Sequence, residues 1–245
     1  MGSPVKAVVL AAGKGTRIQT EGTDLPKVMR EALGKPLLSY VLTAVDFIPK
    51  EDVVIVVGYK KESVMSAFPE YSYAVQEQQL GTGHAVMAAY KVLGDYEGDL
   101  LVCSGDMPLL SRETYSELAR VHSESGNDCT ILTGTSRTSL PYGRIVRSSD
   151  GEFEGIVEDK DCTPEQKLID ELNSSVYMFN AKALKKALPE LKNNNAQGEY
   201  YLTDAPGYMQ DTGLKVGVCR RDLGDEIIGV NTVRQLHEVE GILNV

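Results

Sequence analysis

The sequence has no apolar run approaching the roughly 18 residues that a membrane-spanning helix needs. The N-terminal apolar run from Val5 to Ala12 is interrupted by Lys6 and does not have the form of a signal peptide. The four cysteines form no C-x-x-C pair and no zinc-ligand spacing, which favours reduced, buried thiols. We therefore expect a cytoplasmic protein that does not associate with membranes.

Positive charge is also scarce, with 25 Lys and Arg against 35 Asp and Glu and a net charge of −10. A field of this sign repels nucleic acid, so we expect no nucleic-acid partner. A phosphorylated small molecule can bind such a chain only where positive charge is concentrated locally. The remaining composition, 42% hydrophobic and 24% charged residues, is ordinary for a globular protein, and 245 residues suit one large α/β domain or a domain with a small lobe.

Apolar patterning divides the chain into two halves. In the first half strands alternate with helices, which predicts a parallel, doubly wound sheet. The predicted strands there are 5–10, 52–57, 73–76 and 99–104, and the predicted helices begin at Pro36 or cover 61–68, 83–93 and 112–125. In the second half we predict strands at 129–136, 143–147, 152–158, 172–179, 215–220 and 226–230, and helices at 181–191, 199–211 and 232–243. The expected fold is α/β, with a Rossmann-like, mixed and mainly parallel sheet and a smaller antiparallel lobe at one edge of a pocket.

A loop of small residues follows the first predicted strand, with the sequence Leu10-Ala11-Ala12-Gly13-Lys14-Gly15-Thr16-Arg17. Ligands of open α/β sheets bind beyond the carboxyl ends of the strands, and small residues let backbone N–H groups approach phosphate oxygens. Lys14 and Arg17 supply local positive charge. The third glycine of a dinucleotide-binding motif is missing, because Ile18 stands there, and no Walker A pattern is present. A tight turn with exposed basic residues is the alternative.

Three further residues suggest phosphate and metal binding. Lys27 follows Pro26, which can hold a lysine rigidly toward a phosphate, although a solvated lysine fits the same pattern. Asp106 follows the predicted strand 99–104, where a carboxylate is placed either to hold Mg²⁺ or to cap the next helix. Asn231, at the start of the last predicted helix, is an N-cap, a metal ligand or both.

Amide-rich segments suggest contacts to a base and a sugar. Residues 76–85 follow a strand and open a helix, and their side-chain amides suit the edge of a pyrimidine base, while a polar loop is the alternative. Gly143, Glu158 and Asn173 lie at strand edges, where each alone could be surface decoration. The run 193–204 is either a polar loop between helices or the polar lip of a pocket.

Taken together, the segments 10–17, 79–85 and 193–204 resemble one family. They are similar to the N-terminal uridyltransferase, or pyrophosphorylase, domain of the bacterial bifunctional N-acetylglucosamine-1-phosphate uridyltransferase/glucosamine-1-phosphate acetyltransferase, and the similarity covers residues 6–240. The resemblance implies a nucleotidyltransferase fold and a Mg²⁺-dependent reaction. In that reaction UMP passes from UTP to N-acetylglucosamine-1-phosphate, which gives pyrophosphate and the UDP-N-acetylglucosamine used in peptidoglycan and cell wall biogenesis.

The same resemblance implies a role for each matching residue. Arg17 and Lys27 would be catalytic, acting on the phosphates, and Asp106 and Asn231 would hold the Mg²⁺. The substrate-binding residues would be Leu10, Ala11, Ala12, Gly13, Lys27, Gln76, Gly81, Thr82, Ser104, Gly105, Asp106, Gly143, Glu158, Asn173 and Asn231. Three features depart from the family pattern: the span from Arg17 to Lys27 is longer, Ser104 replaces a tyrosine, and Ser174-Ser175 stands where Thr-Gly is common.

The family continues into a left-handed β-helix that trimerises the enzyme and carries the acetyltransferase. We assign residues 1–230 to the nucleotidyltransferase domain and 231–245 to a C-terminal helix that resembles the start of the linker, and we expect no acetyl transfer. The oligomeric state stays open. Two alternatives are nucleotidyl transfer to another phosphorylated sugar or alcohol, and a catalytically silent subunit that binds a nucleotide sugar. The presence of Asp106 and Asn231 together with Arg17 and Lys27 argues against the silent subunit.

Overall fold

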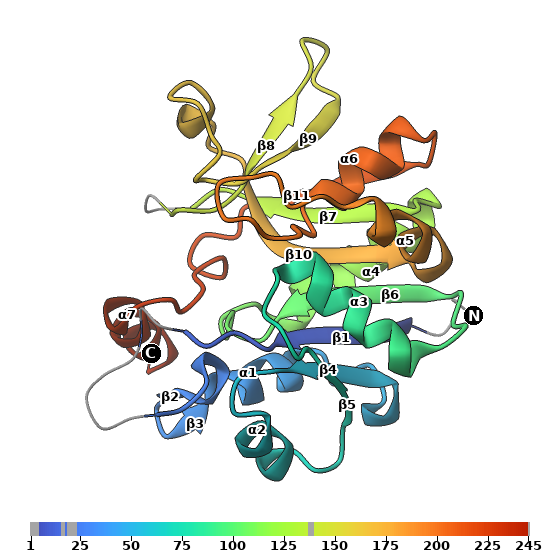
Figure 1. Cartoon of the computed structure of the whole chain (residues 1–245). Coiled ribbons are helices and arrows are strands. Elements are labelled where there is room, and N and C mark those ends of the chain that lie inside the picture. Colours follow the sequence, from blue (N-terminus) through green and yellow to red (C-terminus); the bar gives the residue numbers. More distant parts are fainter. Residues whose placement is uncertain (1–4, 16–17, 19–23, 137–139, 245) are drawn as a thin grey trace.

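The computed structural model describes residues 5–15, 18, 24–136 and 140–244. Within these ranges a nine-stranded sheet crosses the molecule, with its main strands in the order β11-β7-β10-β6-β1-β4-β5 (Figure 1). The bounds of these strands are β1 Val5–Ala11, β4 Val53–Val57, β5 Ser72–Val75, β6 Asp99–Ser104, β7 Cys129–Gly134, β10 Leu172–Asn180 and β11 Val216–Arg221. The remaining strands are β8 Arg144–Arg147 and β9 Phe153–Val157 of this sheet, and a separate pair, β2 Glu31–Ala32 and β3 Lys35–Pro36.

The sheet is mixed and mainly parallel. The strands β6, β1, β4 and β5 are parallel neighbours, and β11 is parallel to β7. Between these two groups lies β10, which is antiparallel to both β6 and β7. The predicted fold class, a mainly parallel α/β sheet with a smaller antiparallel part, is therefore confirmed.

Helices cover both faces of the sheet. Because successive strand residues point to opposite sides, each buried strand packs against both layers of helices. In β1, Ala7 and Val9 join a core formed with α1 Leu37–Ala44, α2 Lys61–Ala67 and α4 Arg112–Ser125. Val8 points the other way, into a core formed with α3 Thr82–Leu93, α5 Ala181–Ala187 and α6 Asp204–Asp211. The β1 strand is thus buried from both faces, and its fixed position makes the loop after it a rigid platform.

The antiparallel lobe is a hairpin of β8 and β9 that projects beyond the sheet (Figure 1). It is tied to the sheet through Glu171, which is 4% exposed. Arg147 of β8 donates to both Glu171 oxygens, at 2.8 and 2.7 Å, and Thr133 of β7 donates to it at 2.7 Å. Burial raises the pKa of Glu171, but these bonds outweigh burial and leave the pKa below its usual value. A charged carboxylate therefore fixes the hairpin against the start of β10.

Two predicted elements differ in the structure. The predicted strand 226–230 is irregular, because its N–H groups bond to turns and loops: the Ile228 N–H donates to Asp225, and the Val230 N–H donates to the Asp106 carbonyl at 2.9 Å. The predicted helix 199–211 begins only at Asp204. Tyr200 is instead bonded to the start of α3 and the segment before it: its N–H donates to the Leu80 carbonyl, and its carbonyl accepts from the Gly83 N–H in the first turn of α3.

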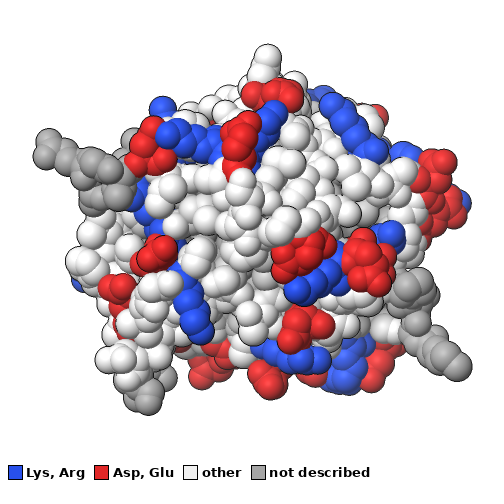
Figure 2. All heavy atoms as spheres, turned by 90° about the horizontal axis from the view of Figure 1, so that it is seen from below, with Lys and Arg blue, Asp and Glu red and all other residues white. Residues whose placement is uncertain are grey.

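The last helix, α7 Val233–Leu243, packs on the rest of the chain beside β2 (Figure 1). Its fully buried Val239 shares a core with Ile18, Leu37 and Ile228. No helix among the described residues is long and apolar enough to cross a membrane. On the face shown in Figure 2, acidic and basic side chains are intermingled, so neither sign of charge forms a continuous patch there.

Candidate active site

The carboxyl ends of β1 and β6 bring two of the predicted loops together. Leu10 is opposite Ser104 in the parallel register, and the Gly105 N–H donates to the Leu10 carbonyl at 2.9 Å. The loop that begins at Leu10 and the loop that carries Asp106 therefore leave the sheet side by side. In open α/β sheets, ligands bind in the crevice beyond the carboxyl ends of the strands.

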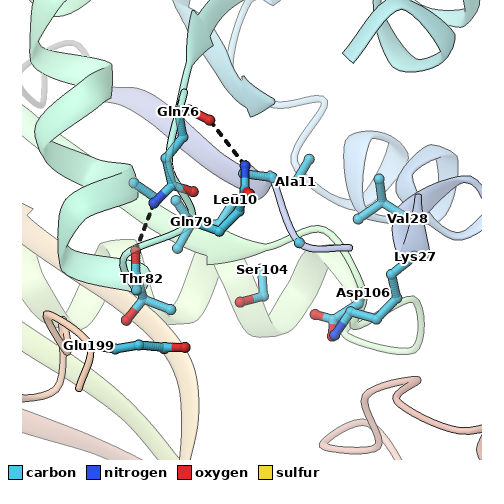
Figure 3. A pocket seen from close by; sticks show the side chains of 14 residues that line it. Leu10, Ala11, Lys27, Val28, Gln76, Gln79, Thr82, Ser104, Asp106 and Glu199 are labelled. Atoms are coloured by element: carbon cyan, nitrogen blue, oxygen red, sulfur yellow. Dashed lines mark hydrogen bonds and ion pairs between the residues drawn. The ribbon is translucent and has the colours of Figure 1, made fainter. Parts of the chain in front are cut away.

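A first cavity opens at this edge (Figure 3). Its lining comes from the loop after β1, the segment at Lys27, the start of α3, the end of β6 and the polar run near residue 199. The lining residues are Leu10, Ala11, Ala12, Gly13, Lys27, Val28, Gln76, Gln79, Gly81, Thr82, Ala85, Ser104, Asp106 and Glu199.

A second cavity adjoins the first. It is lined by Thr82, Ser104, Asp106, Met107, Pro141, Tyr142, Glu158, Ser175, Gln197, Glu199, Tyr201, Gly229 and Asn231. Four residues, Thr82, Ser104, Asp106 and Glu199, line both cavities. The two cavities are therefore two halves of one cleft, and Asp106 lies where they meet.

Lys27 joins the two predicted metal ligands. Its ammonium forms an ion pair with the Asp106 carboxylate and donates to Asn231 Oδ1 at 3.0 Å. Figure 3 shows Lys27 and Asp106 pointing toward one another at the edge of the first cavity. The side chains of Lys27 and Asp106 are 19% and 13% exposed, so this pair is largely shielded from water. Lys27 is 79 positions from Asp106 and 204 positions from Asn231 along the chain, and the fold brings the three side chains together.

The same arrangement fits a divalent cation. Asp106 and Asn231 direct one carboxylate oxygen and one amide oxygen toward a common cation, which here is the lysine ammonium. Mg²⁺ is bound in proteins by one or two carboxylates that are completed by phosphate oxygens and water. No group of three or more His, Cys, Asp or Glu side chains among the described residues forms a closed metal site. An open site with two protein ligands matches a metal that is shared with a phosphorylated substrate.

At the far end of the first cavity, Gln76 is held rigidly. It is 3% exposed, its Nε2 donates to the Gly81 carbonyl at 3.0 Å, and the same nitrogen lies 3.1 Å from His84 Nδ1. His84 therefore helps to hold the Gln76 side chain in place. With Nε2 engaged, Gln76 Oε1 is the atom placed to accept a hydrogen bond from a ligand.

Gly81 is required by its surroundings. It has a φ of +109°, and a Cβ at this position would lie 2.6 Å from the Tyr200 carbonyl oxygen. The close approach comes from a backbone clip, in which the Tyr200 N–H donates to Leu80 and the Gly83 N–H donates to Tyr200, both at 2.8 Å. The predicted polar lip 193–204 is thereby attached to the base of the first cavity.

The second cavity is lined by a half-buried acid, Glu158. Burial raises the pKa of Glu158, and the nearby Asp204 and Asp161 raise it further. Tyr142 lines the same cavity; its hydroxyl accepts from the Gly229 N–H at 2.7 Å, and burial raises the pKa of this tyrosine. Tyr142 thus connects the start of the hairpin lobe to the segment that leads into Asn231.

The start of β10 forms a sharp turn beside the second cavity. The register of β10 shifts between Asn173 and Tyr177, and Ser175 has a φ of +59°. Asn173 stabilises this turn by donating to the Tyr177 hydroxyl at 2.7 Å and by accepting from the Ser175 N–H at 3.2 Å. Ser175 faces the cavity, whereas Asn173 is 1% exposed and lies behind the lining.

The structure gathers most of the predicted site residues. The first cavity takes Leu10, Ala11, Ala12, Gly13, Lys27, Gln76, Gly81, Thr82, Ser104 and Asp106, and the second takes Glu158 and Asn231. Gly105, Gly143 and Asn173 line neither cavity and support it from behind, through bonds such as Asn173 N–H to the Gly143 carbonyl at 2.9 Å. Arg17, the second predicted catalytic residue, lies outside the described residues.

Several lining residues were not predicted individually. Gln197, Glu199 and Tyr201 come from the run 193–204, whose density of polar groups indicated a lip but not which side chains face inward. Gln79 lies in the amide-rich run 76–85, beside the residues that were chosen. Tyr142 precedes Gly143, and only the fold reveals its bond to Gly229.

Comparison with known proteins identifies the family. The family model described as the MobA-like NTP transferase domain matches residues 7–199. The chain belongs to this family. The match includes the loop after β1, both halves of the cleft up to Glu199, and Asp106, whereas Asn231 and α7 lie beyond it.

Several curated proteins that are similar to this chain carry the name Bifunctional protein GlmU. The protein of Thermoanaerobacter pseudethanolicus is 45% identical over 237 residues, which cover 96% of this chain and 51% of the relative. That of Lactobacillus gasseri is 44% identical over 225 residues, covering 91% and 48%, and that of Alkaliphilus metalliredigens is 40% identical over 240 residues, covering 98% and 52%. The chain thus spans about half the length of these relatives. A crystal structure of UDP-glucose pyrophosphorylase complexed with UDP-glucose superimposes with a TM-score of 0.77 over 98% of both chains; at 19% identity it shows the shared nucleotidyltransferase fold alone.

Proposed function

We propose that this chain transfers UMP from UTP to N-acetylglucosamine-1-phosphate, forming UDP-N-acetylglucosamine and pyrophosphate with the help of Mg²⁺. The two-part cleft is the observation that carries the proposal. Because Thr82, Ser104, Asp106 and Glu199 line both cavities, a nucleotide in the first and a phosphorylated sugar in the second would meet at Asp106. The similarity to GlmU proteins of several bacteria supports the choice of substrates.

The reaction needs no nucleophilic side chain. An oxygen of the sugar phosphate forms the new bond to the α-phosphorus of UTP, and the bond to the β-phosphate breaks and leaves with pyrophosphate. Catalysis then consists of alignment and of neutralising negative charge. We assign the alignment to the four residues that line both cavities, which would hold the two substrates next to one another.

Two side chains and a metal would supply the positive charge. Asp106 and Asn231 would hold Mg²⁺, and this ion would withdraw charge from the phosphate oxygens while they react. Lys27 lines the first cavity beside these ligands and brings the ammonium that neutralises phosphate. Arg17 retains the phosphate-binding role assigned from the sequence. The proposal covers nucleotidyl transfer alone, and we expect no acetyl transfer from acetyl-CoA by these 245 residues.

Base and sugar selection would be divided between the two cavities. Gln76 Oε1 is positioned to accept the N3–H of uracil, and Gly81 allows the base to lie close to the backbone. Glu158 and Tyr142, together with the turn at Ser175, would contact the sugar hydroxyl and acetamido groups. A carboxylate accepts several sugar hydroxyl groups at once, which suits a polyhydroxylated ligand.

The first experiment is a pyrophosphate-release assay with UTP and N-acetylglucosamine-1-phosphate, with and without Mg²⁺. Glucose-1-phosphate and the three other nucleoside triphosphates are the matched controls. We expect Mg²⁺-dependent release confined to UTP and the N-acetylated sugar. Release with a different pair would overturn the assigned substrates, and no release with any pair from folded protein would overturn nucleotidyl transfer itself.

Asp106→Asn tests the metal assignment. The substitution preserves size and one oxygen but removes the charge that binds Mg²⁺, so we expect kcat/KM to fall by about a thousandfold, in the range of a lost transition-state electrostatic contact. Asp99→Asn, at the other end of the same strand, is the control and should keep wild-type turnover. Full activity of Asp106→Asn at ordinary Mg²⁺ concentrations would refute the assignment.

A further inference from the structure

Asn231 is placed by bonds from three directions. The residue before it, Val230, donates its N–H to the Asp106 carbonyl at 2.9 Å, and Gly229 donates to Tyr142 at 2.7 Å. These two bonds fix the backbone before Asn231. The third bond comes from the following helix, and it acts on Asn231 itself.

That third bond belongs to the start of α7. Thr232 is the N-cap, and its Oγ1 accepts from the Gln235 N–H at 3.2 Å. Gln235 reaches back, so that its Oε1 accepts from the Asn231 N–H at 2.9 Å and from the Thr232 hydroxyl at 3.2 Å. This is a variant of the capping box, in which the side chain three residues into the helix satisfies an N–H at the helix start. Here the N–H belongs to the residue just before the cap.

The capping box restricts the side chain of Asn231. An N–H bond to Gln235 on one side and the Val230 bond on the other fix the Asn231 backbone, which leaves the side chain few rotamers that reach the cleft. The observed rotamer places Oδ1 3.0 Å from Lys27 Nζ, beside Asp106. Gln235 lines neither cavity of the cleft. Its side chain therefore reaches the cleft through its bond to Asn231.

The helix that carries Gln235 is itself anchored. Val239, one turn further along α7, is fully buried against the core that contains Ile18 and Leu37. Gln235 is consequently not a surface side chain that moves with a fraying helix end. It transmits the position of a packed helix to a residue of the cleft.

We infer that Gln235 is a positioning residue for metal binding, which holds Asn231 Oδ1 in the orientation that completes the site with Asp106. The inference deepens the proposed function and rests on it, since it takes Asn231 to be a ligand of the metal. Partners that orient a metal ligand commonly change metal affinity by ten- to a hundredfold when they are removed. The effect of Gln235 should therefore appear in metal affinity before it appears in anything else.

Four variants separate this role from simple helix stability. Gln235→Leu keeps the size of the side chain and removes the acceptor, and Gln235→Asn keeps an amide that is one methylene too short to reach the Asn231 N–H. Gln235→Glu keeps an acceptor oxygen at the same distance. Asn180→Ala is the matched control, because Asn180 caps α5 by accepting from the Ala183 N–H at 3.0 Å, remote from both cavities.

The measurement is Mn²⁺ binding in the presence of UTP, followed by water-proton relaxation, which reports the ion bound to protein and requires no turnover. We expect Gln235→Leu and Gln235→Asn to weaken Mn²⁺ binding about tenfold. Gln235→Glu should remain within about twofold of wild type because the capping bond survives. Asn180→Ala should bind Mn²⁺ like wild type, although urea unfolds it at a lower concentration. The Mg²⁺ concentration that gives half-maximal rate should follow the same order.

Equal Mn²⁺ affinity in Gln235→Leu, Gln235→Asn and Asn180→Ala would overturn the inference, as would a Gln235→Glu protein as weak as the leucine variant. If Gln235→Leu fails to fold, the comparison of Gln235→Asn with Gln235→Glu decides. Failure of the proposed function has a different signature. Wild-type protein that binds Mn²⁺ with UTP but forms no UDP-N-acetylglucosamine would refute the proposed reaction, while the affinities of the variants would still decide the role of Gln235.

Discussion

Ser175 adopts a backbone conformation that few side chains tolerate. Its φ of +59° belongs to the left-handed region, where residues other than glycine are strained by about 1 kcal/mol or more. The residue lines the second cavity, and the turn around it is bonded through Asn173. The strain therefore lies where the cleft needs a sharp bend at the start of β10.

Ser175→Gly should relieve this strain. We expect the free energy of unfolding in urea to rise by about 1 kcal/mol, less the entropy that an added glycine costs in the unfolded chain. Ser174→Gly is the matched control on the neighbouring residue. Ser174 is fully buried and its hydroxyl donates to the Leu132 carbonyl at 2.7 Å, so removal of this hydroxyl should lower the free energy of unfolding. Destabilisation of equal size in both variants would show that Ser175 is not strained.

Glu158 should make stability depend on pH. Burial holds the pKa of Glu158 above the ordinary value of 4.5. The folded protein then binds a proton more readily than the unfolded chain, so ionised Glu158 costs stability, and this cost grows as pH rises from 4.5 through the folded pKa. Glu158→Gln removes the cost. At pH 7 the variant should be more stable than wild type toward urea, and the difference should vanish below pH 4.5, near the unfolded value.

The same substitution should weaken the sugar site. A neutral amide replaces a charged acceptor, and loss of a charged hydrogen bond corresponds to about a tenfold higher KM for the sugar phosphate. The KM for UTP, which occupies the other cavity in the proposed function, should stay unchanged. A variant that loses stability at pH 7 and keeps its KM for the sugar phosphate would contradict both expectations.

At the scale of elements, the clip between the segment before α3 and the polar lip is the most constrained feature. Gly81→Ala adds a Cβ that would lie 2.6 Å from the Tyr200 carbonyl and 2.8 Å from its nitrogen, both of them backbone atoms. Backbone cannot yield as a flexible side chain does. The added strain comes on top of the positive φ of Gly81.

We expect Gly81→Ala to lower the free energy of unfolding by about 3 kcal/mol, as the sum of backbone strain and overpacking. Gly213→Ala is the control, since Gly213 also has a positive φ, of +83°, but nothing lies within 4 Å of its added Cβ. It should lose only about 1 kcal/mol. Thermal or urea unfolding of both proteins measures the difference, and similar losses would show that the clip yields easily. Gly81→Ala should also raise the KM for UTP.

The strands and helices that alternate with clear apolar periodicity were predictable from sequence. The strand 99–104 and the helix 112–125 have the predicted bounds, because the strand is a short apolar run between polar ends and the helix carries apolar residues at a helical period. The segment 226–230 was not predictable as a loop. Its apolar residues are buried as in a strand, but its N–H groups find partners in Asp106 and Tyr142, which only the tertiary fold brings near.

The candidate site was likewise predictable only in part. The loop after β1, together with Asp106, follows strands that end at one sheet edge, so topology alone predicts its convergence. Lys27 and Asn231 are bonded to each other across 204 positions of sequence, and no local pattern indicates that contact. Gly143 and Asn173 were expected to face the substrate, and the structure places them behind the cavity lining, where they shape it.

At the scale of the whole molecule, α7 is an integral part of the fold. Its apolar side chains pack with Ile18 and Leu37 near the start of the chain and with Ile228 and Val230 near its own start. We therefore propose that residues 1–230 and 231–245 are not separate functional units, because a boundary after residue 230 would divide one packed core. The helix both covers part of the core and positions the residue just before it.

A chain ending at residue 230 tests this proposal. It should lose about 3 kcal/mol of unfolding free energy, mainly from exposing the surfaces that bury Val239 and its neighbours, and it should show no metal-dependent turnover. Val239→Ala in the full chain is the control. We expect it to lose about 2 kcal/mol and to retain turnover, because Asn231 and Gln235 remain. A shortened protein with wild-type stability and activity would refute the integral role of α7.

The position of Asn231 late in the chain also orders events during synthesis. A ribosome makes the first cavity, with its β1, β6 and α3 components, well before it reaches Asn231 and the helix that orients it. Domains generally fold as units, and α7 packs into one core with Ile18 and Leu37, so we expect the metal pair to form only when this late segment has joined the fold. Under the proposed function, chemistry would begin only once the last helix had docked.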